Sequence, residues 1–258
     1  MSVKQLLDLS GRIAIITGGS RGLGLQIAEA LGEMGARLAL TARKKDELDG
    51  AVVALAKQGV ESQAWVCDMG KRDTIAGVFD QILGRFGRVD ILVNNAGATW
   101  GAPAEDHPLE AWDKLVNVNL SGAFILAQLV AKKSMIPARW GRIVNVASIA
   151  GLIASDPVVV KTVSYNATKH AVVGMTRQLA AEWGRHGITV NAICPGFFPT
   201  TMTRVMLDAT GKRVLEGTPT GRPGGPEDLK GLAVLLASEA SRHITGQAIA
   251  VDGGAMII

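Results

Sequence analysis

Two side chains four residues apart have the types and the spacing for acid–base chemistry. Tyr165 and Lys169 lie in the segment Tyr-Asn-Ala-Thr-Lys, and Tyr165 is the only tyrosine in this chain of 258 residues. On a helix, residues i and i+4 are neighbours on one face. A nearby ammonium favours the phenolate and lowers the pKa of a tyrosine from about 10 toward the range of a general acid or base. The pair predicts proton transfer, although the same spacing also occurs by chance on an ordinary amphipathic helix.

A glycine-rich segment near the N-terminus is suited to phosphate binding. Thr17–Gly24 reads Thr-Gly-Gly-Ser-Arg-Gly-Leu-Gly and stands between an apolar run and apolar residues at helical spacing, an order that predicts a strand, a tight turn and a helix start. Glycine lets the backbone approach a ligand, and a helix N-terminus offers free N–H groups to a pyrophosphate. Gly18, Gly22 and Gly24 differ in spacing from the Gly-x-Gly-x-x-Gly fingerprint, and a turn without a ligand is the alternative.

The elements that position these residues alternate between strands and helices. The expected strands are residues 13–16, 37–41, 63–67, 89–93, 142–147, 188–193 and 248–251. The expected helices between them include residues 74–86, 123–135 and 165–183. Such alternation predicts an α/β fold, a Rossmann-type doubly wound parallel sheet of about seven strands with helices on both faces. Because no linker divides the chain, residues 1–258 are expected to form a single domain.

Polar residues follow several of the expected strands directly. Asp68, the run Asn94–Gly97, Ser148 and the pair Pro195–Gly196 each come right after an apolar strand. Parallel strands place their carboxyl ends at one edge of a sheet, where ligands bind. These residues are therefore expected along a single crevice.

Composition excludes several classes of function. The formal net charge is +4 and the basic residues are dispersed, so the polybasic runs of a nucleic-acid or membrane-surface binder are absent. Cys67 and Cys194 each lie in an apolar run, which suits core residues in a reducing compartment. Met1–Ser10 lacks the long apolar core of a signal peptide, and no uninterrupted apolar run has the length of a membrane span. The expectation is a soluble cytoplasmic protein with no nucleic-acid partner, membrane partner or metal site.

Together the motifs resemble the short-chain dehydrogenase/reductase family, and the resemblance covers nearly the whole chain. In order, they are Thr17–Gly24, Asn94–Gly97, Asn119, Ser148, Tyr165 with Lys169, and Pro195–Gly196 with Thr200. The resemblance implies that Tyr165 is the catalytic acid/base and that the Ser148 hydroxyl holds the substrate carbonyl oxygen. It implies that Lys169 binds the nicotinamide ribose and lowers the pKa of the tyrosine, and that Asn119 anchors a proton-relay water. Hydride transfer from the cofactor builds negative charge on the carbonyl oxygen, which two hydroxyl donors stabilise.

The resemblance also bears on the choice of cofactor. Where NAD-preferring members carry an acidic residue at the end of the second strand, this chain has Ala42, followed by Arg43. Arg43, with Arg21 of the glycine turn, is therefore expected to bind the 2′-phosphate of NADP(H). Asp68 is expected to meet the adenine amino group, with Met69 beside it. The expected cofactor-binding residues are Gly18, Ser20, Arg21, Gly22, Leu23, Gly24, Arg43, Asp68, Met69, Asn95, Gly97, Tyr165, Lys169, Phe198 and Thr200.

The segment between Ser148 and Tyr165 departs from the family pattern. The two residues are 17 positions apart, which is longer than is common in the family, and the extra residues fall within 154–163. The Val158–Val160 run inside it is expected to be either a strand or a buried loop. It either narrows the substrate pocket or packs against a neighbouring subunit.

Three basic residues bear on whether the substrate is attached to a carrier. Acyl-carrier-protein reductases of the family bind their carrier through basic residues flanking the cleft. Arg139 matches one such position, and His186, next to Arg185, stands where an arginine is expected at the other. The three residues either dock a carrier or form a solvated face.

Residues 197–225 match the mobile substrate lid of the family. The apolar residues that this lid offers are Phe197, Phe198, Met202, Met206 and Leu207. They favour a substrate with some hydrocarbon, unless they serve as core residues.

The family resemblance further implies a homo-oligomer. Members of the family usually assemble as tetramers through two long helices, here residues 123–135 and 165–183. Ala167, Ala171 and Gly174 are small and permit close contact between helices. A homotetramer is expected.

The function expected is an NADP(H)-dependent oxidoreductase that interconverts a ketone and a secondary alcohol. The first substrate class is a 3-oxoacyl or related keto compound, including an acyl thioester. The alternative is a sugar acid, as in the gluconate 5-dehydrogenases that the chain also resembles. An alternative of another class is a non-catalytic NADP(H)-binding sensor or structural subunit. The sequence weighs against it, because all four catalytic positions carry residues that can perform their roles.

Overall fold

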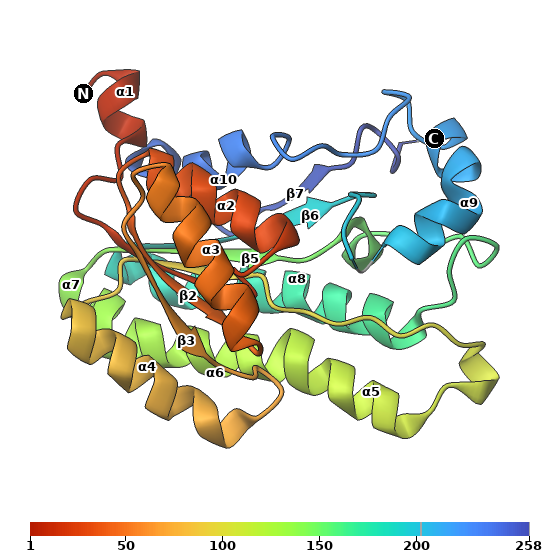
Figure 1. Ribbon diagram of the computed structural model, residues 1–258, viewed down its shortest axis with the longest axis horizontal. Helices are drawn as coiled ribbons and strands as arrows, with labels where there is room; N and C mark the ends of the chain where they lie inside the picture. Colours follow the sequence, from red (N-terminus) through yellow and green to blue (C-terminus); the bar gives the residue numbers. More distant parts are fainter. Residues whose placement is uncertain (202, 258) are drawn as a thin grey trace.

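Seven parallel strands form one sheet in the order β3-β2-β1-β4-β5-β6-β7 (Figure 1). The structure is a computed structural model that describes residues 1–201 and 203–257, with the backbone alone for 204–209. The strands are β1 (Ile13–Thr17), β2 (Arg37–Ala42), β3 (Ser62–Val66), β4 (Ile91–Asn94), β5 (Gly141–Val146), β6 (Ile188–Pro195) and β7 (Ala248–Val251). The strand order reverses between β1 and β4, and such a switch point opens a crevice at the carboxyl ends of the strands.

Helices cover both faces of this sheet. The helices are α1 (Val3–Leu7), α2 (Gly22–Glu33), α3 (Lys45–Lys57), α4 (Arg72–Phe86), α5 (Leu109–Leu115), α6 (Gly122–Val130), α7 (Ile136–Ala138), α8 (Val163–Trp183), α9 (Arg204–Glu216) and α10 (Lys230–Ala237). The core on one face includes residues of α2, α3 and α10, and the core on the other includes residues of α4, α6 and α8 (Figure 1). The predicted α/β fold, a doubly wound parallel sheet with helices on both faces, is confirmed.

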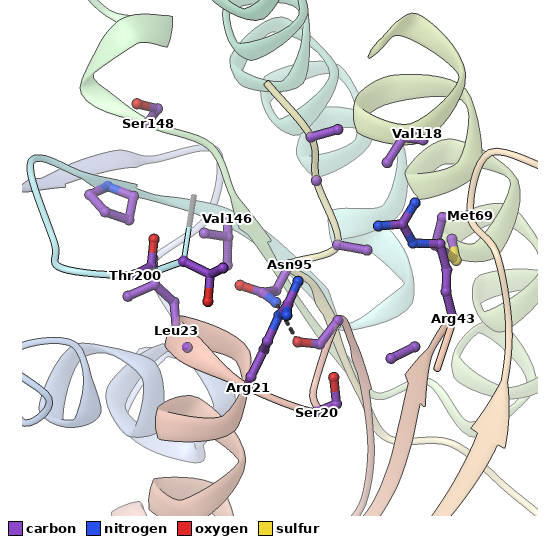
Figure 2. A pocket seen from close by; sticks show the side chains of 18 of the residues that line it. Ser20, Arg21, Leu23, Arg43, Met69, Asn95, Val118, Val146, Ser148 and Thr200 are labelled. Carbon is purple, nitrogen blue, oxygen red and sulfur yellow. Dashed lines mark hydrogen bonds between the residues drawn. The ribbon is translucent and has the colours of Figure 1, made fainter. Parts of the chain in front are cut away.

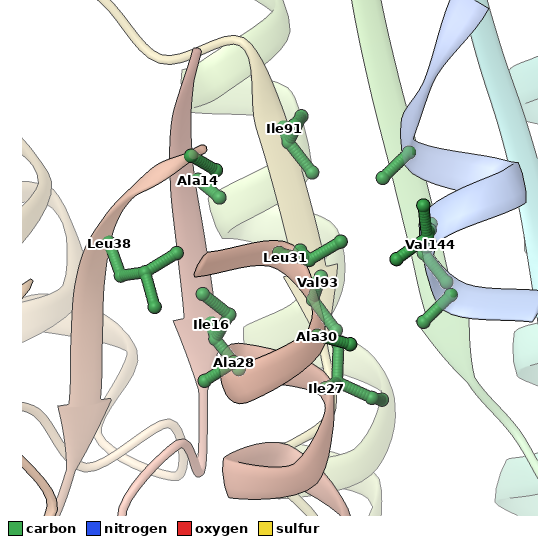
Figure 3. Close-up of a cluster of buried hydrophobic side chains, with 14 of the residues drawn as sticks. Ala14, Ile16, Ile27, Ala28, Ala30, Leu31, Leu38, Ile91, Val93 and Val144 are labelled. Atoms are coloured by element: carbon green, nitrogen blue, oxygen red, sulfur yellow. The ribbon is translucent and has the colours of Figure 1, made fainter. Parts of the chain in front are cut away.

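The uninterrupted apolar strands follow from this double coverage. Every residue of β1 is buried. Ala14 and Ile16 pack with Leu31 of α2 (Figure 3), whereas Ile15 belongs to the core on the opposite face together with Phe79 of α4. Since successive side chains of a strand point to opposite faces, a strand covered on both sides needs apolar residues at every position.

The helix that carries Asn119 is longer than predicted and irregular. Residues 109–138 form one helical run in which two π-helical segments, Val116–Ser121 and Ala131–Met135, separate α5, α6 and α7. By length and composition this run passes as a membrane span, although charged residues interrupt its apolar stretches. The core helix of a water-soluble protein passes the same test, and Leu126 and Val130 lie in the core beneath the sheet.

The segment after Ser148 is neither a strand nor a buried loop, so both expectations for Val158–Val160 are wrong. A single 3₁₀ turn, Ile149–Gly151, is followed by irregular chain, and Val158 is 68% exposed. The Asp156 side chain accepts a hydrogen bond from the Val158 N–H at 2.9 Å, and with Pro157 it forms a local turn. An Asp-Pro pair starts turns in this way because proline presets φ and the carboxylate caps the backbone.

Two helices were not predicted. One is the N-terminal α1, and the other is α9, which lies within residues 197–225. Arg213 of α9 forms an ion pair with Asp156 at 2.7 Å, which joins this region to the segment that follows Ser148. Met202 and the side chains of Met206 and Leu207 lie outside the described residues, whereas Phe198 is buried.

Candidate active site

A cleft of about 270 Å³ runs along the carboxyl edge of the sheet, from the glycine turn after β1 to the loop after β5 (Figure 2). Figure 2 shows Ser20 and Arg21 toward one end, Arg43 near Met69, and Ser148 toward the other end. The predicted site residues that line it are Gly18, Ser20, Arg21, Gly22, Leu23, Arg43, Asp68, Met69, Asn95, Gly97, Ser148, Tyr165, Lys169, Phe198 and Thr200. Of the predicted set, Gly24 and Asn119 do not line the cleft. Each contacts residues that do: Gly24 lies against Gly18 and Asn95, and Asn119 is hydrogen-bonded to Ala98.

The glycine turn needs its glycines for both conformation and space. Gly18 and Gly22 have φ of +64° and +55°, the left-handed region that favours glycine. A Cβ on Gly24 would collide with the Gly18 carbonyl oxygen and with Asn95 Nδ2. Asn95 Nδ2 in turn donates to the carbonyl oxygens of Thr17, at 2.9 Å, and Gly18, at 3.2 Å. The loop after β4 thus holds the turn after β1 in place.

Thr17 is a site residue whose role sequence reasoning missed. Its buried hydroxyl accepts hydrogen bonds from the backbone N–H groups of Asn95, at 3.0 Å, and Ala96, at 2.9 Å. The available signal was a polar residue that ends a wholly apolar strand. These bonds fix the two neighbouring loops against each other, so that the N-terminus of α2 at Gly22 opens onto the cleft.

Positive charge gathers at the end of the cleft beyond β2. Arg21, Arg43 and Lys44 line it together, and Arg21 and Lys44 both bind the carboxylate of Glu47. Arg21 Nη1 lies 3.0 Å and Lys44 Nζ 2.9 Å from Glu47 Oε1, while Ser20 Oγ lies 3.4 Å from Oε2. The hydrogen bond from Lys44 holds the pKa of Glu47 below its ordinary value. Sequence reasoning missed Lys44 and Glu47, although their i, i+3 spacing at the start of a helix was visible.

The lysine of the predicted pair is buried. Lys169 is 5% exposed, and its Nζ donates a 2.7 Å hydrogen bond to the carbonyl oxygen of Val146 at the end of β5. The same Nζ lies 5.5 Å from the centre of the Tyr165 ring. Burial lowers the pKa of Lys169 to about 8, because the ammonium has lost its water. Near neutral pH the side chain is therefore close to its titration point.

The phenol of Tyr165 behaves differently from the prediction. Burial raises its pKa above the ordinary value, and the neighbouring Ser148 hydroxyl, not Lys169, is the group that acts in the opposite direction. The expected lowering by Lys169 is not found, because Lys169 is itself desolvated and directs its Nζ to the Val146 carbonyl. Tyr165 is thus a protonated phenol at neutral pH, which suits a proton donor.

Asn119 has a supporting position. It lies in the π-helical segment Val116–Ser121, a distortion that is frequent at functional sites. Its Oδ1 accepts from the Ala98 N–H at 2.8 Å, and its Nδ2 donates to the Ala98 carbonyl oxygen and to Thr168 Oγ1, both at 3.0 Å. The side chain therefore ties the loop after β4 to α8, on which Tyr165 and Lys169 stand.

Arg139, Arg185, His186 and the Val158–Val160 run all lie outside the cleft. Arg139 precedes β5, and Arg185 and His186 precede β6, so all three lie toward the amino edge of the sheet, away from the cleft. Arg139 Nη2 donates to the Arg185 carbonyl oxygen at 3.2 Å, as in an exposed, solvated face. Val158–Val160 does not line the cleft either. Within residues 1–201 and 203–257, no group of three or more His, Cys, Asp and Glu is arranged to hold a metal.

Comparison with known proteins agrees with this geometry. A family model described as "Enoyl-(Acyl carrier protein) reductase" matches residues 18–256. Over 256 residues the chain is 39% identical to gluconate 5-dehydrogenase of Gluconobacter oxydans, with 98% of each chain covered. It is 34% identical to a 3-oxoacyl-[acyl-carrier-protein] reductase of Aquifex aeolicus, over 96% of this chain and 98% of that one. The crystal structure of a gluconate 5-dehydrogenase from Burkholderia cenocepacia, in complex with NADP and tartrate, superposes with a TM-score of 0.94 at 35% identity over the full length of both chains.

Proposed function

Because the chain belongs to the short-chain dehydrogenase/reductase family, we propose that it is an NADP(H)-dependent oxidoreductase that interconverts a ketone and a secondary alcohol. The observation that carries the proposal is the presence of Ser148, Tyr165 and Lys169 in the same cleft as the glycine turn. One cleft thereby combines a cradle for a dinucleotide with donors for a carbonyl oxygen.

Residues of the protein transfer the proton to the substrate carbonyl oxygen and stabilise the negative charge that develops on it. Tyr165 donates its proton to the carbonyl oxygen during reduction and takes it back during oxidation, while Ser148 donates a hydrogen bond to the same oxygen. Lys169 binds the nicotinamide ribose and, with a pKa of about 8, exchanges protons near neutral pH. Asn119 holds the loop after β4 and helps to anchor a relay water. The hydride is supplied by the bound nicotinamide cofactor.

The residues around the glycine turn fit NADP(H). The space beside Gly24, which a Cβ would fill, lets Asn95 close on the turn and leaves the N-terminus of α2 free for a pyrophosphate. Ala42 offers no carboxylate to a ribose 2′-hydroxyl at the end of β2. Arg21 and Arg43 stand beside it in the cleft and supply guanidinium groups for a 2′-phosphate.

The substrate class proposed first is a 3-oxoacyl or related keto compound. The lid, residues 197–225, places the buried Phe198 in the cleft lining, which suits a substrate with some hydrocarbon. A relative at 34% identity is a 3-oxoacyl-[acyl-carrier-protein] reductase. The position of Arg139 at the opposite edge favours a free thioester over a carrier-bound one.

A sugar acid is the second candidate, and similarity favours it. The gluconate 5-dehydrogenase of Gluconobacter oxydans has the higher identity, 39%, and the gluconate 5-dehydrogenase structure that superposes well holds tartrate, a polyhydroxy acid. Both candidates require the same hydride and proton chemistry at Ser148 and Tyr165.

A substrate screen tests the proposal. NADPH and NADH consumption would be measured with 3-oxoacyl thioesters, 5-ketogluconate and simple aryl ketones. Turnover is expected with NADPH on at least one class, and the class with the higher kcat/KM identifies the substrate. A protein that binds NADPH but turns over nothing in the panel would instead be the non-catalytic sensor or structural subunit.

The proposed assembly is a cytoplasmic homotetramer that forms through α6 and α8. Phe124 of α6 is 40% exposed and lines a groove together with Met175 and Trp183 of α8. Such an exposed apolar groove between two long helices suits a second copy of the chain. Light scattering should give a tetramer, and Phe124→Glu should give smaller species.

A further inference from the structure

The Glu47 carboxylate accepts hydrogen bonds from the same kinds of donor that would bind a phosphate. Its Oε1 accepts from Arg21 Nη1 at 3.0 Å and from Lys44 Nζ at 2.9 Å, and its Oε2 lies 3.4 Å from Ser20 Oγ. The side chain lines the cleft together with Arg43 and is 23% exposed. Guanidinium, ammonium and hydroxyl donors around two oxygens make a site for an oxyanion, here filled by a carboxylate of the protein itself.

We propose that Glu47 competes with the 2′-phosphate of NADP(H) for Arg21 and Lys44, and thereby limits the preference of this protein for NADP(H) over NAD(H). The inference rests on the proposed function, since it takes the 2′-phosphate to bind at Arg21. A bound phosphate either breaks the two ion pairs of Glu47 or lies beside its negative charge, and each outcome weakens NADP(H) binding. NAD(H) carries a 2′-hydroxyl, which can donate a hydrogen bond to a carboxylate. Glu47 therefore does not weaken the binding of NAD(H).

The competitor is charged throughout the physiological range. Glu47 stands in the first turn of α3, where the helix dipole favours a carboxylate. The hydrogen bond from Lys44 lowers its pKa further, so protonation does not relieve the competition near neutral pH.

The chain offers a matched control on the same helix. Asp49 of α3 forms an ion pair with Lys45, Nζ to Oδ2 at 2.6 Å, and does not line the cleft. Asp49→Asn removes one negative charge and one lysine ion pair from α3, as Glu47→Gln does, but away from Arg21.

The test measures binding by isothermal titration calorimetry on the full-length protein. The probes are NADPH, NADH, 2′,5′-ADP and 5′-AMP. The last two lack the nicotinamide and differ only in the 2′-phosphate, so the ratio of their Kd values isolates its contribution. Glu47→Gln is expected to lower the Kd of NADPH and of 2′,5′-ADP by about three- to tenfold, with the Kd of NADH and 5′-AMP unchanged or raised. Asp49→Asn is expected to change each Kd by less than about twofold. Glu47→Ala should act in the same direction, with thermal melting as the check that each variant is folded.

Three outcomes overturn the inference, and a fourth refutes the cofactor assignment on which it rests. If Glu47→Gln weakens 2′,5′-ADP binding, the carboxylate positions Arg21 for the phosphate and does not compete with it. If the variant strengthens NADPH and NADH equally, the effect is general and the 2′-phosphate is not involved. If the wild type and the Glu47→Gln variant both bind NADPH no more tightly than NADH, and 2′,5′-ADP no more tightly than 5′-AMP, the cofactor assignment itself is refuted. A wild type that prefers NADPH, with a Glu47→Gln variant of unchanged preference, refutes the Glu47 inference alone.

Discussion

The two edges of the sheet bury charged side chains in different ways. At the amino edge, Arg142 is 2% exposed and donates to the carbonyl oxygens of Ser238 and Gly141, both at 2.9 Å, and to Glu239 Oε2 at 3.3 Å. At the carboxyl edge, Lys169 is 5% exposed, and within the described part of the chain its Nζ shows one hydrogen bond, to Val146. The first cation is satisfied by the protein, and the second keeps donor capacity for a ligand.

Aromatic contact completes the amino edge. The centre of the Trp140 ring lies 3.6 Å from the guanidinium carbon of Arg12 and 4.4 Å from that of Arg142, and its Nε1 donates to Glu239 at 2.5 Å. Burial lowers the pKa of Arg142 to about 10, with Glu239 acting in the opposite direction. Cation–π contact and ion pairing together offset the loss of water around Arg142.

The difference between Arg142 and Lys169 indicates that the amino edge of the sheet serves stability and the carboxyl edge serves binding and catalysis. A buried charge whose hydrogen bonds are all made holds neighbouring elements in a single arrangement. A buried charge with spare donors costs stability, and the cost is retained where the charge serves binding or chemistry. Substitutions at the amino edge should therefore change stability alone, and those at the carboxyl edge should mainly change binding or turnover.

The largest effect is expected for Tyr165→Phe. The variant lacks the proton donor, so kcat should fall by about a thousandfold, within the range that general acid catalysis supplies. The Kd for NADPH, measured by nucleotide fluorescence, should stay within about twofold. A kcat within tenfold of the wild type would remove Tyr165 from the proposed mechanism.

Arg142→Met should destabilise the fold at the amino edge of the sheet and leave catalysis unchanged. Glu239 Oε2 and the Ser238 carbonyl oxygen would lose the hydrogen bonds from Arg142, and the free energy of unfolding should fall by about 2–4 kcal/mol in urea titrations. The kcat per folded molecule should equal that of the wild type. A change in kcat with unchanged stability would contradict the division between the two edges.

Lys169→Met should make stability depend differently on pH. The folded protein holds Lys169 with a pKa of about 8, below the unfolded value of 10.5, so the unfolded chain binds more protons between these pH values. Wild-type stability therefore gains from rising pH across this window, and the variant lacks that gain. The free energy of unfolding of the wild type relative to the variant should increase by about 2 kcal/mol from pH 7.5 to pH 10. A difference that does not vary with pH would mean that Lys169 stays fully charged.

The smallest effect is expected for Arg43→Ala. Loss of one exposed guanidinium at the cleft should raise the Kd for NADPH about three- to tenfold, leave the Kd for NADH unchanged, and alter stability by less than about 0.5 kcal/mol. Arg139→Ala is the control, because Arg139 lies toward the amino edge and does not line the cleft. Equal weakening of NADPH and NADH would remove Arg43 from the phosphate site.

Most of the fold could be predicted because the covered sheet imposes a strong pattern. β7 was predicted at its observed bounds, and β5 was displaced by one residue. The errors fall where the pattern is weak. Val158 is apolar but stands in an exposed turn set by Asp156 and Pro157, and no periodicity reveals α9 inside a segment rich in Gly, Pro and Thr.

The membership of the site could also be predicted, but the state of its groups could not. Ser148, Tyr165 and Lys169 line the cleft as expected. The rise of the Tyr165 pKa depends on burial, and the bonds of Asn119 depend on a π-helical segment and on Thr168. Spacing in the chain carries no information on either.

The sequence by itself determined the alternation of strands and helices, the glycine turn and the residue types that line the cleft, because these depend on side-chain period and on chemistry that each residue carries alone. The tertiary structure alone decided that Glu47 binds Arg21 and that Glu239 binds the buried Arg142. Those contacts join residues far apart in the chain, and their strength depends on how much water the fold removes from each charge.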